Sequence, residues 1–220
     1  MAEAAKILFL VLSALFPIVD PLGGSPIFLA MTREYSSTTR RALSWRIAIN
    51  SFFLLVGSYF IGSHILSFFG ISLPVVQVGG GLVVTTTGWA LLKQGNVVAP
   101  KGVKQNIEPT DPFHNAFYPL TLPLTVGPGS ISVAITLGAN AHPHQGIHLL
   151  SILAATLGCF LLTVSIYLCY GFSHRLGQIL GVTGMTVIMQ LTSFLLVCIG
   201  VQIMWNGASA LLAQVPMHMR

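Results

Sequence analysis

Apolar residues run through this chain in six continuous stretches, each long enough to cross the hydrocarbon core of a bilayer, which takes roughly 20 helical residues. The stretches do not alternate apolar and polar positions, so they predict helices rather than the strands of an outer-membrane barrel. Charged residues make up 7% of the chain and apolar residues 54%, which excludes a soluble fold. The sequence therefore predicts an all-α membrane protein. The six predicted spans are residues 5–31, 44–69, 73–92, 113–139, 147–172 and 186–212.

Basic residues divide the loops into two groups. The loops after the first, third and fifth spans carry Arg or Lys, whereas the loops at residues 70–72 and 140–146 hold neither. By the positive-inside rule the first group is cytoplasmic and both termini lie outside. The net charge of +5 follows this topology, so we expect no nucleic-acid partner. Residues 1–15 resemble a signal peptide, but the apolar chain continues to residue 31, so we expect them to remain as the first span.

Two motifs rich in Pro and Gly interrupt the first and fourth spans. The first is FPIVDPLGGSP at residues 16–26, and the second is LPLTVGPGS at residues 122–130. Proline removes a helix hydrogen bond and glycine loosens the backbone, so each motif predicts a broken helix. Non-helical backbone at membrane depth persists only where it is buried in protein or lines a watery cavity. Paired breaks of this kind point to a transport site, although two structural proline kinks would give the same pattern.

The order of features repeats in the two halves of the chain. Each half has a broken span, then a Gly-led turn into its third span at Gly70 or Gly181, then a Gln at position 77 or 190. Three spans are an odd number, so the second half enters the membrane from the opposite side and forms an inverted repeat. The predicted division is residues 1–93, a cytoplasmic linker at 94–112, and residues 113–220.

Asp20 is the acidic residue that falls inside a predicted span. A carboxylate at the centre of a membrane helix costs about 2.5–3.5 kcal/mol, so we expect it to bind substrate or a proton, or to cap the helix that restarts after the break. Two restarted helices would place their N-termini at mid-membrane, where they favour a carboxylate ligand. Gln77 and Gln190 join the candidates, although hydrogen bonding between helices is the simpler explanation for them. The candidate substrate-binding residues are Asp20, Pro21, Gly23, Gly24, Ser25, Thr125, Gly127, Pro128, Gly129, Ser130, Gln77 and Gln190.

Motifs for other kinds of chemistry are missing from the sequence. It contains no His-Glu-x-x-His run, no Gly-x-Ser-x-Gly elbow and no phosphate loop, so we expect neither an enzyme nor a cofactor. Uphill transport would then use an ion gradient, with H⁺ and Na⁺ both open as the coupling ion. His142, His144 and His148 lack further ligands, so no metal site is expected.

Four motifs together resemble the MarC family of bacterial and archaeal inner-membrane proteins. They are FPIVDPLGG at 16–24, GISLP at 70–74, GGG at 79–81 and LPLTVGPGS at 122–130, and the resemblance extends from the first span to the last. That family is grouped with amino-acid exporters of the LysE type, and some members are described as carriers of glycine and alanine. Many relatives have Asn in place of Asp20, and several have Arg in place of Gln77 and Gln190.

The resemblance and the residue patterns lead to the same hypothesis. It is a secondary transporter of small neutral amino acids or similar metabolites in the inner membrane, working by alternating access between the two broken helices. Its expected partners are a small-molecule substrate and the lipid bilayer, with a homo-oligomer left open. The alternative is a non-transporting membrane assembly factor or stress-associated factor.

Overall fold

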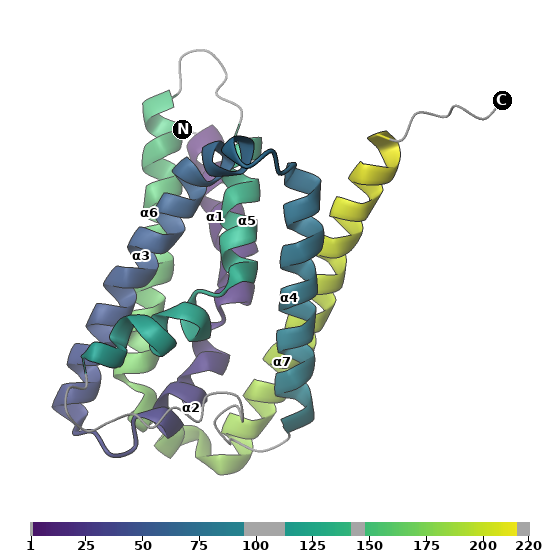
Figure 1. The fold of residues 1–220 in the computed structure, drawn as a ribbon. Helices are drawn as coiled ribbons and strands as arrows, with labels where there is room; N and C mark the ends of the chain where they lie inside the picture. Colours follow the sequence, from purple (N-terminus) through teal and green to yellow (C-terminus); the bar gives the residue numbers. More distant parts are fainter. Residues whose placement is uncertain (1, 95–112, 142–147, 215–220) are drawn as a thin grey trace.

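The computed structural model describes residues 2–94, 113–141 and 148–214, and within these ranges every regular element is a helix (Figure 1). Five segments are long and apolar enough to cross a membrane, and the number rises to six if one bent pair of helices counts as a single span. The predicted all-α membrane protein is therefore confirmed, with five or six spans. The elements are α1 (Ala2–Val19), α2 (Pro21–Met31), α3 (Ser37–Phe68), α4 (Leu73–Gln94), η1 (His114–Ala116), η2 (Phe117–Thr125), α5 (Pro128–Asn140), α6 (His148–Gly171) and α7 (Ser173–Gln214).

Two helices begin earlier than their predicted spans. α3 starts at Ser37 rather than at residue 44, because the Ser36 hydroxyl accepts a hydrogen bond from the Thr39 N–H at 3.1 Å and caps it. α7 starts at Ser173 rather than at residue 186, and it bends at Gly181, whose φ is 64°. Most of the predicted linker, from residue 95 to residue 112, lies outside the described residues, as do His142 and His144.

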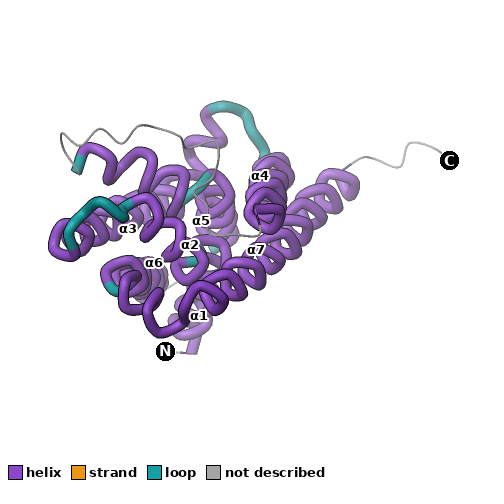
Figure 2. Tube along the Cα trace, turned by 90° about the horizontal axis from the view of Figure 1, so that it is seen from below, coloured by secondary structure: helices purple, strands orange, loops and turns teal. Residues whose placement is uncertain are grey.

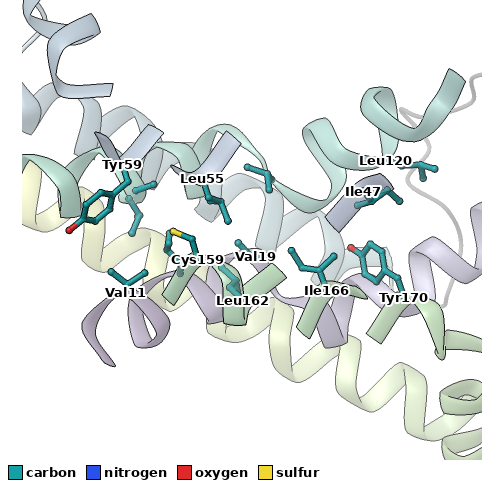
Figure 3. Close-up of a cluster of buried hydrophobic side chains, with 14 of the residues drawn as sticks. Val11, Val19, Ile47, Leu55, Tyr59, Leu120, Cys159, Leu162, Ile166 and Tyr170 are labelled. Atoms are coloured by element: carbon teal, nitrogen blue, oxygen red, sulfur yellow. The ribbon is translucent and has the colours of Figure 1, made fainter. Parts of the chain in front are cut away.

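The core lies among α1, α3, α5 and α6 (Figure 3). Val11 of α1, Leu55 of α3 and Leu162 of α6 are completely buried there. Cys159 is buried in the same cluster and has a free thiol, so it packs there as a small apolar side chain. This apolar cluster holds the first, second, fourth and fifth spans together.

The third span of each half forms a closely packed pair outside that core. α4 and α7 lie side by side in both views (Figure 1, Figure 2). At Gly81 of α4 an added Cβ would lie 2.6 Å from the carbonyl oxygen of Gly200 in α7, so the two backbones touch where side chains are absent. The pair contacts the other spans chiefly through α5, which packs on α4, and α2, which packs on α7.

The crossing of α5 and α3 depends on Gly138. A Cβ at this position would overlap the carbonyl oxygen of Tyr59, which is fixed backbone. We expect Gly138→Ala to destabilise the protein by about 1–3 kcal/mol, the usual cost of overpacking, and to lower its melting temperature in detergent. Gly57→Ala is the matched control, because Gly57 lies in α3 with nothing within 4 Å of its added Cβ. Equal melting temperatures for the two variants would contradict the close α3–α5 contact.

Candidate functional site

The first break is the single residue Asp20, between α1 and α2. Its backbone is left-handed, with φ 44° and ψ 64°, a conformation that Asp tolerates better than most residues. Its carboxylate Oδ1 accepts from the Gly23 N–H at 2.9 Å, which caps α2. The capping role is therefore confirmed. The Thr192 hydroxyl of α7 lies beside Gly23, and it donates to the Ile188 carbonyl oxygen of its own helix at 2.9 Å.

The second break lies between η2 and α5, whose axes differ by 69°. η2 contains Pro123 and is irregular, because Tyr118 and Leu122 inside it have extended backbone, and it ends where Val126 becomes extended, with φ −115° and ψ 93°. The Thr121 and Thr125 hydroxyls each donate, at 2.7 Å, to the carbonyl oxygen five residues earlier. These side-chain bonds satisfy backbone carbonyl groups in a segment that lacks a regular helix ladder.

The two restarted helices differ at their N-termini. Asp20 caps α2, whereas no described side chain caps α5. The Ser130 hydroxyl does not accept from the helix, since it donates to the Gly127 carbonyl oxygen at 2.9 Å. The first turn of α5 therefore presents its N–H groups and its partial positive charge without a neutralising side chain.

A cavity of about 410 Å³ lies between the two breaks. It brings residues of the first motif together with residues of the second, which lie about half the chain away in sequence. Among the predicted site residues, its lining contains Asp20, Gly23, Gly24, Thr125, Gly127, Pro128, Gly129 and Ser130.

Four predicted site residues do not line the cavity. Pro21 is buried at the start of α2, and the Ser25 hydroxyl turns to α6, where it donates to the Cys169 carbonyl oxygen at 3.2 Å. Gln77 lies against Gly207 of α7, and Gln190 is exposed on the outside of α7. Gln77 thus sits at the interface of α4 and α7, whereas Gln190 is exposed and absent from the cavity lining.

Apart from Thr87 of α4, the remaining lining is apolar. Among the lining residues Asp20 is the one with a charged side chain, and no Lys or Arg faces the cavity. The lining reaches Met31 at the end of α2 and Leu91 near the end of α4, so the cavity extends toward the end of the bundle where those two helices finish (Figure 1). The other apolar lining residues are Ile18, Val19, Ile27, Val83, Val84, Pro119, Pro123, Leu124 and Leu196.

Tyr170 of α6 connects the two breaks, and the sequence did not identify it. It is completely buried, its ring stacks on Phe28 with centroids 4.7 Å apart, and its hydroxyl lies 3.1 Å from the Thr125 hydroxyl. The same hydroxyl lies against Gly24, where an added Cβ would be 2.5 Å away. A Tyr near the end of an apolar span usually marks the membrane interface, so its sequence position gave no signal of this role.

These features define a multi-span α-helical membrane protein whose first and fourth spans are interrupted on either side of one internal cavity. The chain belongs to the MarC family: the family described as MarC family integral membrane protein matches residues 5–212. The family assignment made from the four motifs is confirmed.

Three relatives illustrate the similarity. The inner membrane protein MarC of Escherichia coli (strain ATCC 8739) is 30% identical over 212 residues, covering 94% of this chain and 96% of the relative. The proteins of the same name from Salmonella arizonae and Salmonella typhimurium are 32% and 31% identical over 213 residues, with the same coverage. No solved structure matches this chain.

Proposed function

We propose that this protein is a secondary transporter of a small neutral amino acid or a similar metabolite, located in the inner membrane with both termini on the outer side. The observation that carries the proposal is the cavity between the two breaks, which contains one carboxylate and one uncapped helix N-terminus. The names of the relatives support the inner-membrane location, and the distribution of Arg and Lys supports the orientation.

The asymmetry of the breaks suggests how a zwitterion would bind. Its ammonium group would bind the Asp20 carboxylate, one oxygen of which accepts a hydrogen bond from the Gly23 N–H. Its carboxylate would meet the N-terminus of α5 at Gly129 and Ser130, where no side chain competes. The two N-termini were expected to share the substrate carboxylate, but Asp20 occupies the N-terminus of α2, so α5 takes this role alone.

Packing between equivalent elements supports the inverted repeat and its use in alternating access. α3 packs on α6, α4 packs on α7, and the contact of α2 with α7 corresponds to that of α5 with α4. Gly70 and Gly181, at equivalent places before the third spans, both have positive φ. In such repeats one half rocks against the other around a central site, and here that site is the cavity.

Uptake into proteoliposomes tests the proposal. We expect radiolabelled alanine to enter vesicles containing the protein faster than protein-free vesicles, and an imposed H⁺ or Na⁺ gradient to increase its accumulation. Gln190→Ala is a suitable control, because this residue is exposed away from the cavity and its replacement should leave uptake unchanged. Absence of uptake, together with no thermal stabilisation by any amino acid in a ligand screen, would favour the non-transporting alternative.

A further inference from the structure

Two arginines from different helices meet at one aromatic ring near an end of the bundle. Arg41 belongs to α3 and Arg175 to α7, and the Cζ atom of each lies 5.8 Å from the centre of the Phe172 ring. Phe172 is the residue between α6 and α7. The ring attracts both guanidinium groups, so two like charges share one small region of the surface. We call Arg41, Phe172 and Arg175, with Trp45 and Tyr167, the arginine–aromatic patch.

Aromatic side chains extend the patch across α3 and α6. The Arg41 Nε donates to the Tyr167 hydroxyl at 3.0 Å, and the Trp45 ring packs edge-on against Tyr167 with centroids 5.5 Å apart. Trp45 is 56% exposed and Phe172 is 38% exposed. Exposed Trp and Tyr near the ends of membrane spans lie at the level of the lipid headgroups. The patch is therefore at headgroup depth rather than in the aqueous loops.

The charge of the patch is not balanced within the described part of the chain. No salt bridge joins Arg41 or Arg175 to a described carboxylate, and within the described residues neither guanidinium group has an interaction beyond those given above. Two neighbouring guanidinium groups without a counter-ion suit a phosphate, which they bind through paired N–H donors. Beyond the patch, exposed apolar side chains of the same helices offer a surface for acyl chains: Ile49, Phe53, Leu161 and Leu168.

We propose that the arginine–aromatic patch binds the headgroup phosphate of an anionic phospholipid. The two guanidinium groups hold the phosphate, Phe172 keeps them together, and Trp45 and Tyr167 lie beside the glycerol region. The acyl chains run along the exposed apolar faces of α3 and α6. The site is distinct from the internal cavity, whose lining includes none of these residues.

Thermal unfolding in detergent with added phosphatidylglycerol or phosphatidylcholine tests the proposal. Phosphatidylglycerol should stabilise the wild-type protein more than phosphatidylcholine does. In the double variant Arg41→Gln/Arg175→Gln, the concentration needed for half of this stabilisation should rise about tenfold or more, because charge-assisted hydrogen bonds are lost. The matched control is Arg33→Gln/Arg46→Gln, which removes the same charge at the same end of the bundle and should respond as the wild type does.

Two further measurements distinguish a specific lipid-binding site from general attraction between charges. Phe172→Leu keeps both charges but removes the ring that gathers them, so its response to phosphatidylglycerol should also weaken. Sodium phosphate and glycerol phosphate should not reproduce the stabilisation, because they lack the acyl chains. Equal losses in the two double variants, an unchanged response in Phe172→Leu, or full stabilisation by free phosphate would each overturn the lipid site.

Discussion

Asp20→Asn is expected to reduce alanine uptake at low substrate concentration by about tenfold or more, since a hydrogen bond to a charged group contributes roughly 1.5–3 kcal/mol. The Asn side chain is nearly the same size and caps a helix as well as Asp does. Its oxygen can still accept from the Gly23 N–H, which now lies 2.9 Å from the Asp20 carboxylate. The melting temperature should therefore change little. Initial uptake rates and thermal unfolding, measured on the same preparation, separate binding from stability.

Two further variants complete this test. Asp20→Ala removes both the charge and the cap, so it should lose uptake and also about 1 kcal/mol of stability. Glu34→Gln removes a carboxylate that is exposed outside the cavity, and it should transport normally. Wild-type uptake by Asp20→Asn would show that Asp20 serves as a helix cap and not as a ligand.

Gly24→Ala is the second variant with a large expected effect. Its new methyl group would lie 2.5 Å from the Tyr170 hydroxyl, which is buried and has no room to retreat. We expect a loss of about 1–3 kcal/mol from overpacking, together with a strong fall in uptake, because α2 lines the cavity. Thermal unfolding and uptake of the single variant measure the two effects.

A second substitution should rescue this variant. Tyr170→Phe removes the hydroxyl, and the nearest remaining ring carbons would lie 3.4 and 3.5 Å from the methyl group added at Gly24, an ordinary contact. Tyr170→Phe alone should cost about 1 kcal/mol, the net value of one hydrogen bond. Thr125 keeps its bond to the Leu120 carbonyl oxygen in that variant. If the double variant is no more stable than Gly24→Ala, the contact between Gly24 and Tyr170 does not hold.

The sequence predicted the spans and the position of both interruptions because these depend on local physics. Apolar length sets the number of spans, and Pro and Gly weaken a helix wherever they occur. The start of α3 was not predicted, because its first turns are polar and a predicted span begins only where apolar residues begin. The bend of α7 at Gly181 follows from a local positive φ, yet nothing in the sequence showed that helical chain continues on both sides of it.

The site was predicted in part, for a related reason. The motif residues face one cavity because they lie at the breaks themselves. Ser25 and Tyr170 depend on contacts between helices, which a single sequence does not reveal. Ser25 bonds to a carbonyl oxygen 144 positions away, and Tyr170 reaches Thr125 across 45 positions. The equivalence of Gln77 and Gln190 was inferred from order along the chain, which does not specify burial: Gln77 is half-buried and Gln190 is exposed.

The glycine contact between α4 and α7 has a mechanical consequence. Two helices whose backbones touch resist bending apart and act as a single stiff strut. This strut meets the other spans chiefly at α2 and α5, the same two helices that resume after the interruptions. A tilt of the strut would therefore displace α2 and α5 together, so that the walls on both sides of the cavity shift in one movement.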